Sequence, residues 1–159
     1  MPQFTLKTYQ ARALDELAQF LRQASAMGLE AAWAHSMTRH ALPNVPYRTD
    51  ELGPVPCVCL RIPTGGGKTL MASHAIARIG SAWTNAPFPL ALWLTPSDMI
   101  RSQTLSALQS PQHPYAAALR DAYGDAYRVI EIGDLATIAP QDFGRVAIVV
   151  VATIQTFRV

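Results

Sequence analysis

The sequence predicts a three-layer α/β fold with a mostly parallel central sheet. Two observations support this class. Short apolar, β-branched segments alternate along the chain with amphipathic segments of helical period, and a run of three glycines stands between one predicted strand and one predicted helix. With 159 residues, the chain has the length of a single domain with a sizeable core.

The first predicted element is an amphipathic helix that begins near Gln10 and extends to about Ala24. Its leucines recur at helical spacing and mark the inward face (Leu14, Leu17 and Leu21). In the long connection that follows, residues 31–38 could extend as a helix, whereas residues 42–54 contain the prolines and glycine of a loop. We interpret residues 31–54 as an insertion or long loop, either a surface elaboration or a segment that binds a partner.

A glycine-rich loop is the most informative stretch of the chain. Residues 55–62 are mostly apolar and bounded by prolines, which predicts a buried strand, and residues 68–79 have the spacing of a helix that packs on a sheet. The loop between them ends in Gly-Lys-Thr, the signature of a phosphate-binding loop. Its candidate nucleotide-binding residues are Pro63, Thr64, Gly65, Gly66, Gly67, Lys68 and Thr69.

The residue types of this loop suit a nucleoside triphosphate. Glycines adopt backbone conformations closed to other residues, so that successive N–H groups can turn toward a polyphosphate. Lys68 would contact the β- and γ-phosphates, and the Thr69 hydroxyl would bind the Mg²⁺ that the phosphates carry; these two are the candidate catalytic residues. The chain has eleven arginines but only two lysines, and one of them stands here. The alternative is a glycine-rich turn followed by an ordinary lysine.

Three more strands are predicted, over residues 90–95, 127–132 and 146–152. The last is continuously apolar, which is typical of a central parallel strand covered on both faces. Ser97 is positioned to cap the helix that follows the first of these strands. In such a sheet, the ligand site lies at the carboxyl ends of the strands.

Composition and residue spacing do not indicate a zinc protein, a secreted protein or a membrane protein. The chain is 50% hydrophobic and only 15% charged, as expected if sheet neighbours are missing, and its net charge of +2 does not by itself indicate nucleic-acid binding. Cys57 and Cys59 would face the same side of a strand as buried free thiols, and the histidines have no zinc-site spacing. The sequence lacks a signal segment and any apolar run of about 20 residues, which predicts a cytoplasmic protein with no membrane partner.

The stretch Arg61-Ile62-Pro63-Thr64-Gly65-Gly66-Gly67-Lys68-Thr69 resembles motif I of superfamily 2 helicases, and looks most like the DEAD/DEAH-type and type III restriction helicase subunits. The strict phosphate loop begins with glycine where this chain has Ile62. The resemblance covers nearly the whole chain outside residues 31–54. It implies that residues 1–159 are the N-terminal RecA-like lobe of an ATP-dependent motor that uses ATP and Mg²⁺.

Other family motifs follow in order. Tyr9-Gln10 resembles the Q-motif, which implies that the Gln10 carboxamide reads adenine and that Tyr9 or Phe4 covers the base. Alternatively, Tyr9 belongs to the core and Gln10 simply opens the first helix. The segment after residue 94 resembles motif Ia, and the segment after residue 152 resembles the threonine segment of the family. The implied nucleic-acid contacts of these two segments are Thr95, Ser97, Arg101 and Thr153, with Gln103 and Gln155 nearby.

These two nucleic-acid motifs also have simpler interpretations. The motif Ia residues could form a capped strand-to-helix junction, and Thr153 could be only a helix cap.

No Asp-Glu pair follows Lys68, although the family orders Mg²⁺ with such a pair on the strand after the threonine segment. We therefore expect the chain to be part of a longer motor that binds ATP without turning it over efficiently, with its second RecA-like lobe missing. The resemblance implies nucleic acid as the partner, DNA in preference to RNA, and a nuclease or methyltransferase as a possible partner subunit. Two other functions stay open: a small-molecule kinase or transferase, and a non-catalytic interaction module.

Overall fold

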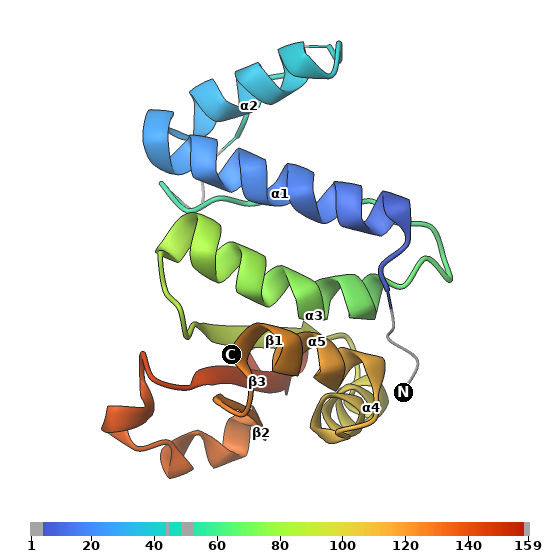
Figure 1. The fold of residues 1–159 in the computed structure, drawn as a ribbon, viewed down its shortest axis with the longest axis vertical. Coiled ribbons are helices and arrows are strands. Elements are labelled where there is room, and N and C mark those ends of the chain that lie inside the picture. Colours follow the sequence, from blue (N-terminus) through green and yellow to red (C-terminus); the bar gives the residue numbers. More distant parts are fainter. Residues whose placement is uncertain (1–4, 44, 49–52, 158–159) are drawn as a thin grey trace.

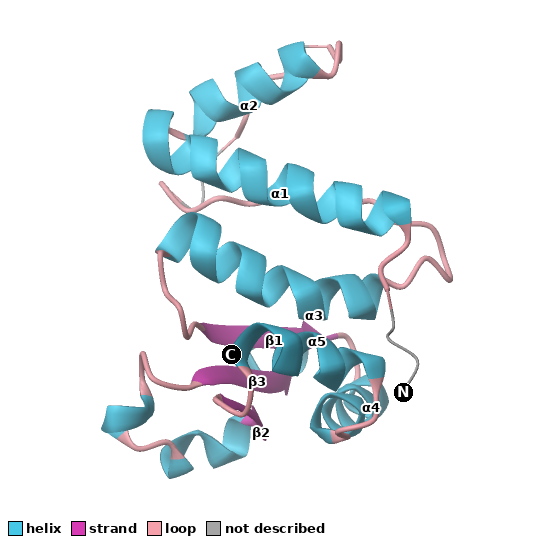
Figure 2. Ribbon diagram, viewed as in Figure 1, coloured by secondary structure: helices cyan, strands magenta, loops and turns pink. Residues whose placement is uncertain are grey.

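The computed structural model describes residues 5–43, 45–48 and 53–157, and these form an α/β fold (Figures 1 and 2). The helices and strands are, in chain order, α1 (Thr8–Met27), α2 (Leu29–Arg39), α3 (Lys68–Ile79), β1 (Leu90–Thr95), α4 (Asp98–Gln109), α5 (Pro114–Tyr123), β2 (Tyr127–Glu131) and β3 (Ala147–Thr153). A π-helical turn, η1 (Gly80–Thr84), continues α3, and three short 3₁₀ helices are η2 (Ile132–Thr137), η3 (Pro140–Asp142) and η4 (Ile154–Phe157).

The sheet is parallel and has the strand order β1-β3-β2. β3 is the central strand, and its residues 147–152 are all buried, as the sequence predicted. On one face, Val149 and Val151 pack with Leu108 of α4 and Leu119 of α5. On the other face, Ile148 and Val150 of β3 pack with Ile130 of β2 and with Ile138, the residue that follows η2.

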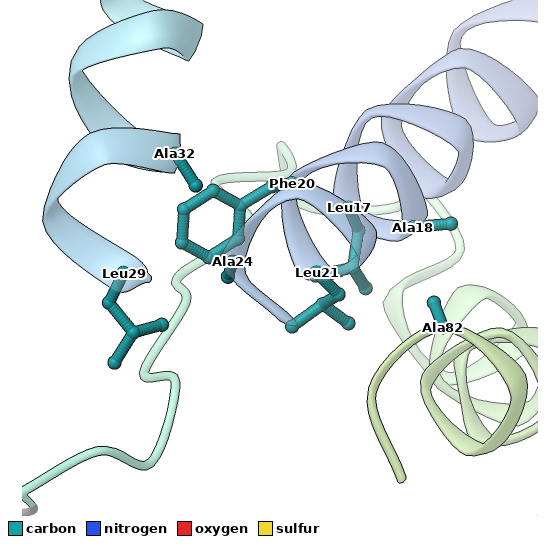
Figure 3. Packing of buried hydrophobic residues seen from close by; sticks show 8 residues of the cluster. All are labelled: Leu17, Ala18, Phe20, Leu21, Ala24, Leu29, Ala32 and Ala82. Atoms are coloured by element: carbon teal, nitrogen blue, oxygen red, sulfur yellow. The ribbon is translucent and has the colours of Figure 1, made fainter. Parts of the chain in front are cut away.

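Helices α1 and α2 form a second cluster with Ala82 of η1 (Figure 3). The predicted inward face of α1 is confirmed, because its three leucines are at most 7% exposed. Phe20 of α1 packs edge-on against Trp33 of α2, with ring centroids 6.1 Å apart, and Tyr47 contacts both rings. The predicted helical extension in residues 31–38 is confirmed, because α2 covers these residues. Aromatic contacts join α2 and the following loop to α1.

The prediction of a buried strand over residues 55–62 is wrong. This stretch is irregular, Val58 and Leu60 are each 37% exposed, and Cys57 and Cys59 are exposed free thiols instead of buried ones. The backbone N–H and C=O of Cys57 are bonded to the Tyr47 hydroxyl, at 2.6 and 2.9 Å, and not to a strand. An apolar, β-branched sequence favours a strand, but the strand forms only where another strand lies beside it, and none of the described strands does.

Unfilled space adjoins this irregular stretch and the outer edge of β1. A cavity of about 380 Å³ lies between residues 56–62, α1 and α3, and another of about 450 Å³ lies between α3 and β1. Three leucines of β1 remain 45 to 56% exposed (Leu90, Leu92 and Leu94). β1 is thus an uncovered edge strand among the described strands.

In the described part of the chain, no helix is long and apolar enough to span a bilayer.

Candidate functional site

The glycine-rich loop makes a tight turn directly before α3. The N–H of Gly66 donates to the carbonyl oxygen of Pro63, 3.0 Å away, and this bond closes the turn. Gly65 and Gly67 have φ angles of 75° and 76°, in the left-handed region that favours glycine. Gly67 is the N-cap of α3, and its carbonyl accepts the N–H of Met71 at 3.0 Å. The loop therefore turns directly into a helix N-terminus, where the helix dipole favours an anion.

Lys68 is the first residue of α3, and its side chain lies on the surface beside the loop. Its ammonium group donates to the carbonyl oxygen of Pro63, 3.1 Å away. Thr69 follows in the first turn of the helix and is half-buried. This arrangement places one positive charge and one hydroxyl at the helix N-terminus, which suits a polyphosphate that carries a divalent cation.

Helix α1 brings Tyr9 and Gln10 onto the same loop, although they lie more than fifty residues away in the sequence. The Tyr9 hydroxyl donates to the carbonyl oxygen of Gly66 at 2.8 Å, and the Gln10 amide nitrogen donates to the same oxygen at 2.9 Å. The Gln10 side-chain oxygen accepts the N–H of Lys7 at 2.8 Å. Gln10 is only 4% exposed, whereas Tyr9 is 42% exposed. Phe4, the other predicted base-covering residue, lies outside the described residues.

The candidate nucleic-acid residues gather at the carboxyl ends of β1 and β3. Thr95 and Thr153 are register partners. Thr95 is 2% exposed, and its hydroxyl lies 3.2 Å from the carbonyl oxygen of Ser97 and 3.3 Å from that of Ala152. The side chain of Gln155 donates to the carbonyl oxygen of Pro96 at 3.0 Å, which joins the two strand ends. Thr95 thus contributes to packing here, and Thr153 remains half-exposed.

Ser97 is the N-cap of α4, as predicted, and its hydroxyl oxygen accepts the N–H of Ile100 at 3.4 Å. Arg101 on the same helix is ion-paired with Asp98 at 2.8 Å and with Glu131 of β2 at 2.6 Å. Hydrogen bonds to Asp98 and then to Glu131 raise the pKa of the Arg101 guanidinium above its ordinary value. The positive charge of Arg101 is therefore offset by two carboxylates. Gln103 is exposed on α4.

Two features of the site have no signal in the sequence spacing. One is the pairing of Arg101 with Glu131, and the other is the contact of Tyr9 and Gln10 with the Gly66 carbonyl. Both join elements that only the tertiary fold brings together. Among the residues that the structure describes, no group of three or more histidine, cysteine, aspartate or glutamate side chains is arranged to hold a metal ion.

Alanine in place of Gly67 should destabilise the chain more than alanine in place of Gly65. Both positions have left-handed φ angles, which cost an L-residue about 1–2 kcal/mol. A Cβ at Gly65 would meet nothing within 4 Å, whereas a Cβ at Gly67 would lie 2.5 Å from the Gln10 amide nitrogen. The Gln10 side chain would have to turn away and lose its bond to Gly66, which adds about 1 kcal/mol.

Urea unfolding of the two variants measures this difference. In a Gln10→Ala background, the Gly65 and Gly67 variants should become equally stable, because the bond is already gone. Equal losses in the parent background would show that the Gln10 contact with the loop contributes nothing.

The family model described as "Type III restriction enzyme, res subunit" matches residues 3–159, almost the entire chain. Neither the comparison with curated proteins nor the comparison with solved structures found a match.

Proposed function

The chain belongs to the family of type III restriction enzyme res subunits, and on that premise we propose that it is the ATP-binding lobe of an ATP-dependent helicase or translocase. The family is of the helicase superfamily 2 type and has a RecA-like fold. The parallel sheet of this chain, with a glycine-rich loop before α3, agrees with that fold. The family also points to ATP-dependent enzymes and to nucleic acid as the partner.

The phosphate loop is the observation on which the proposal rests. Its two left-handed glycines precede the N-terminus of α3, and the exposed Lys68 ammonium donates to the Pro63 carbonyl at the start of the same turn. In the proposal, Lys68 exchanges the Pro63 carbonyl for the β- and γ-phosphates of ATP, and Thr69 binds Mg²⁺. The bound Mg²⁺ would neutralise charge on the phosphates. Gly65, Gly66 and Gly67, with Pro63 and Thr64, would form the cradle.

Adenine recognition is assigned in this proposal to Gln10, with Tyr9 beside the base. Both polar ends of the Gln10 side chain are bonded within the chain, to Lys7 and to Gly66. Reading the adenine edge therefore requires the carboxamide to exchange one of these partners. The partly exposed Tyr9 ring would remain available to contact the base.

Nucleic acid would bind at the ends of β1 and β3 in this proposal. Ser97 and Thr153 are the surface contacts there, Arg101 would have to leave one of its carboxylate partners, and Thr95 would support the strand end. We favour DNA over RNA, with a second RecA-like lobe and a nuclease or methyltransferase subunit as partners, in the cytoplasm. Because no Asp-Glu pair follows Lys68, residues 1–159 would bind ATP without efficient turnover.

Calorimetric titration with Mg-ATP, Mg-GTP and Mg-ADP, with and without single-stranded DNA, tests this function. We expect ATP to bind in preference to GTP, and DNA to change the affinity for ATP. Gln10→Ala should lower the ratio of ATP to GTP affinity by roughly tenfold, the loss of one to two hydrogen bonds, whereas Gln103→Ala on the exposed face of α4 should not. Binding that is blind to the base and to DNA would favour a small-molecule transferase. An absence of binding would favour an interaction module.

A further inference from the structure

One backbone carbonyl in the phosphate loop is held by two side chains from another helix. The Gly66 oxygen accepts hydrogen bonds from the Tyr9 hydroxyl at 2.8 Å and from the Gln10 amide at 2.9 Å. Gly66 itself is buried. Two donors fix this carbonyl in a loop of three glycines, a residue type whose backbone has more conformational freedom than any other.

Fixing this carbonyl also fixes a donor of the loop. The described peptide bonds are all trans, so the N–H of Gly67 points opposite to the carbonyl of Gly66 across their shared peptide plane. The carbonyl points toward α1, and the N–H of Gly67 therefore points away from α1. This N–H directly precedes Lys68, the first residue of α3. Tyr9 and Gln10 thus set the direction of a backbone donor beside the lysine.

The close fit between α1 and the loop supports this arrangement independently. A Cβ at Gly66 would lie 2.5 Å from the Ile62 side chain and 3.4 Å from the Tyr9 hydroxyl, and a Cβ at Gly67 would lie 2.5 Å from the Gln10 amide. Helix α1 is itself anchored, because Asp15 is ion-paired with Arg78 of α3 and Leu14 is fully buried. The helix therefore presents Tyr9 and Gln10 to the loop from a fixed position.

We propose that Tyr9 is a positioning residue for triphosphate binding, and that it acts through its hydroxyl on the Gly66 carbonyl. The inference rests on the proposed function of the loop. Of the two donors, Tyr9 can keep the carbonyl in place when the Gln10 carboxamide turns to another partner. This role differs from covering the base, which would use the aromatic ring and not the hydroxyl.

Tyr9→Phe tests the proposal because it removes the hydroxyl and keeps the ring. The probes are Mg-ATP and Mg-tripolyphosphate, which has no base. We expect both to bind roughly three- to tenfold more weakly to the variant, as the loss of one hydrogen bond would give, with the ratio of the two affinities unchanged. Tyr47→Phe, which removes a hydroxyl bonded to the Cys57 backbone, should leave both affinities unchanged.

A second measurement needs no ligand. The amide NMR signals of Gly66 and Gly67 should move in Tyr9→Phe and stay in place in Tyr47→Phe, while the signals of α4 and α5 stay in place in both variants. Unchanged glycine signals would overturn the inference.

The titrations separate this inference from the proposed function. If the parent binds both ligands and Tyr9→Phe binds them equally well, only the positioning role is overturned. A loss confined to Mg-ATP would overturn it as well, because it would assign Tyr9 to the base. If the parent binds neither ligand, the proposed function and this inference are both overturned.

Discussion

Replacing Lys68 by methionine should abolish the stabilisation of the chain by Mg-ATP and leave the fold unchanged. The Lys68 ammonium lies on the surface and donates to a single loop carbonyl. Lys68 also lines a cavity, and methionine keeps an unbranched apolar side chain of similar length there. A charged hydrogen bond contributes about 1.5–3 kcal/mol. The loss of two such bonds to phosphate would therefore weaken binding by roughly 100-fold or more.

Thermal unfolding with increasing Mg-ATP measures this effect, because a ligand that binds only the folded chain raises its unfolding midpoint. The parent should show a rise that depends on ATP concentration, and Lys68→Met should show none. Lys7→Met is the matched control, since Lys7 is the other lysine of the chain and is exposed before α1. An equal rise in Lys68→Met and the parent would remove Lys68 from the phosphate site.

Replacing Leu119 by alanine should lower the free energy of unfolding by about 2–5 kcal/mol. Leu119 of α5 is fully buried and packs with Leu108 of α4 and with Val149 and Val151 of β3. Truncation would leave a cavity where helices and sheet meet, because the surrounding residues relax only in part.

The same truncation at Leu92 is the matched control. Leu92 is 51% exposed on the uncovered edge strand β1, so alanine there should change stability by no more than about 0.5 kcal/mol. Urea unfolding of both variants measures the difference. Similar losses at the two positions would contradict the packing of α5 on β3, or would show that the edge of β1 is covered.

Elements whose signals are local in the sequence were predictable. The leucine spacing of α1, the glycines before α3 and the apolar run of β3 each determine their structure through residues close in the chain. Residues 55–62 have a strand-like composition and yet form no strand, because a strand also needs a hydrogen-bonding neighbour. Strand order is only partly local: the apolar run of β3 indicates a central strand, but nothing in the sequence spacing indicates that β1 and β2 are its two neighbours.

In the candidate site too, some features could be predicted from the sequence and others depend on tertiary packing. The loop residues are contiguous, and their glycine conformations follow from the sequence. The contacts of Tyr9 and Gln10 with Gly66 depend on how α1 packs against α3, and the ion pair of Arg101 with Glu131 depends on how α4 packs against β2. Whether Gln10 reads adenine and whether Ser97 and Thr153 contact nucleic acid remain predictions.

The central claim is that this loop binds a nucleoside triphosphate through Lys68. Calorimetric titration of Mg-ATP into the parent and into Lys68→Met, in the same buffer, tests it most directly. The account predicts saturable binding with one site per chain in the parent and no measurable binding in the variant. Binding of equal affinity in the two proteins, or no heat of binding in either, would contradict it.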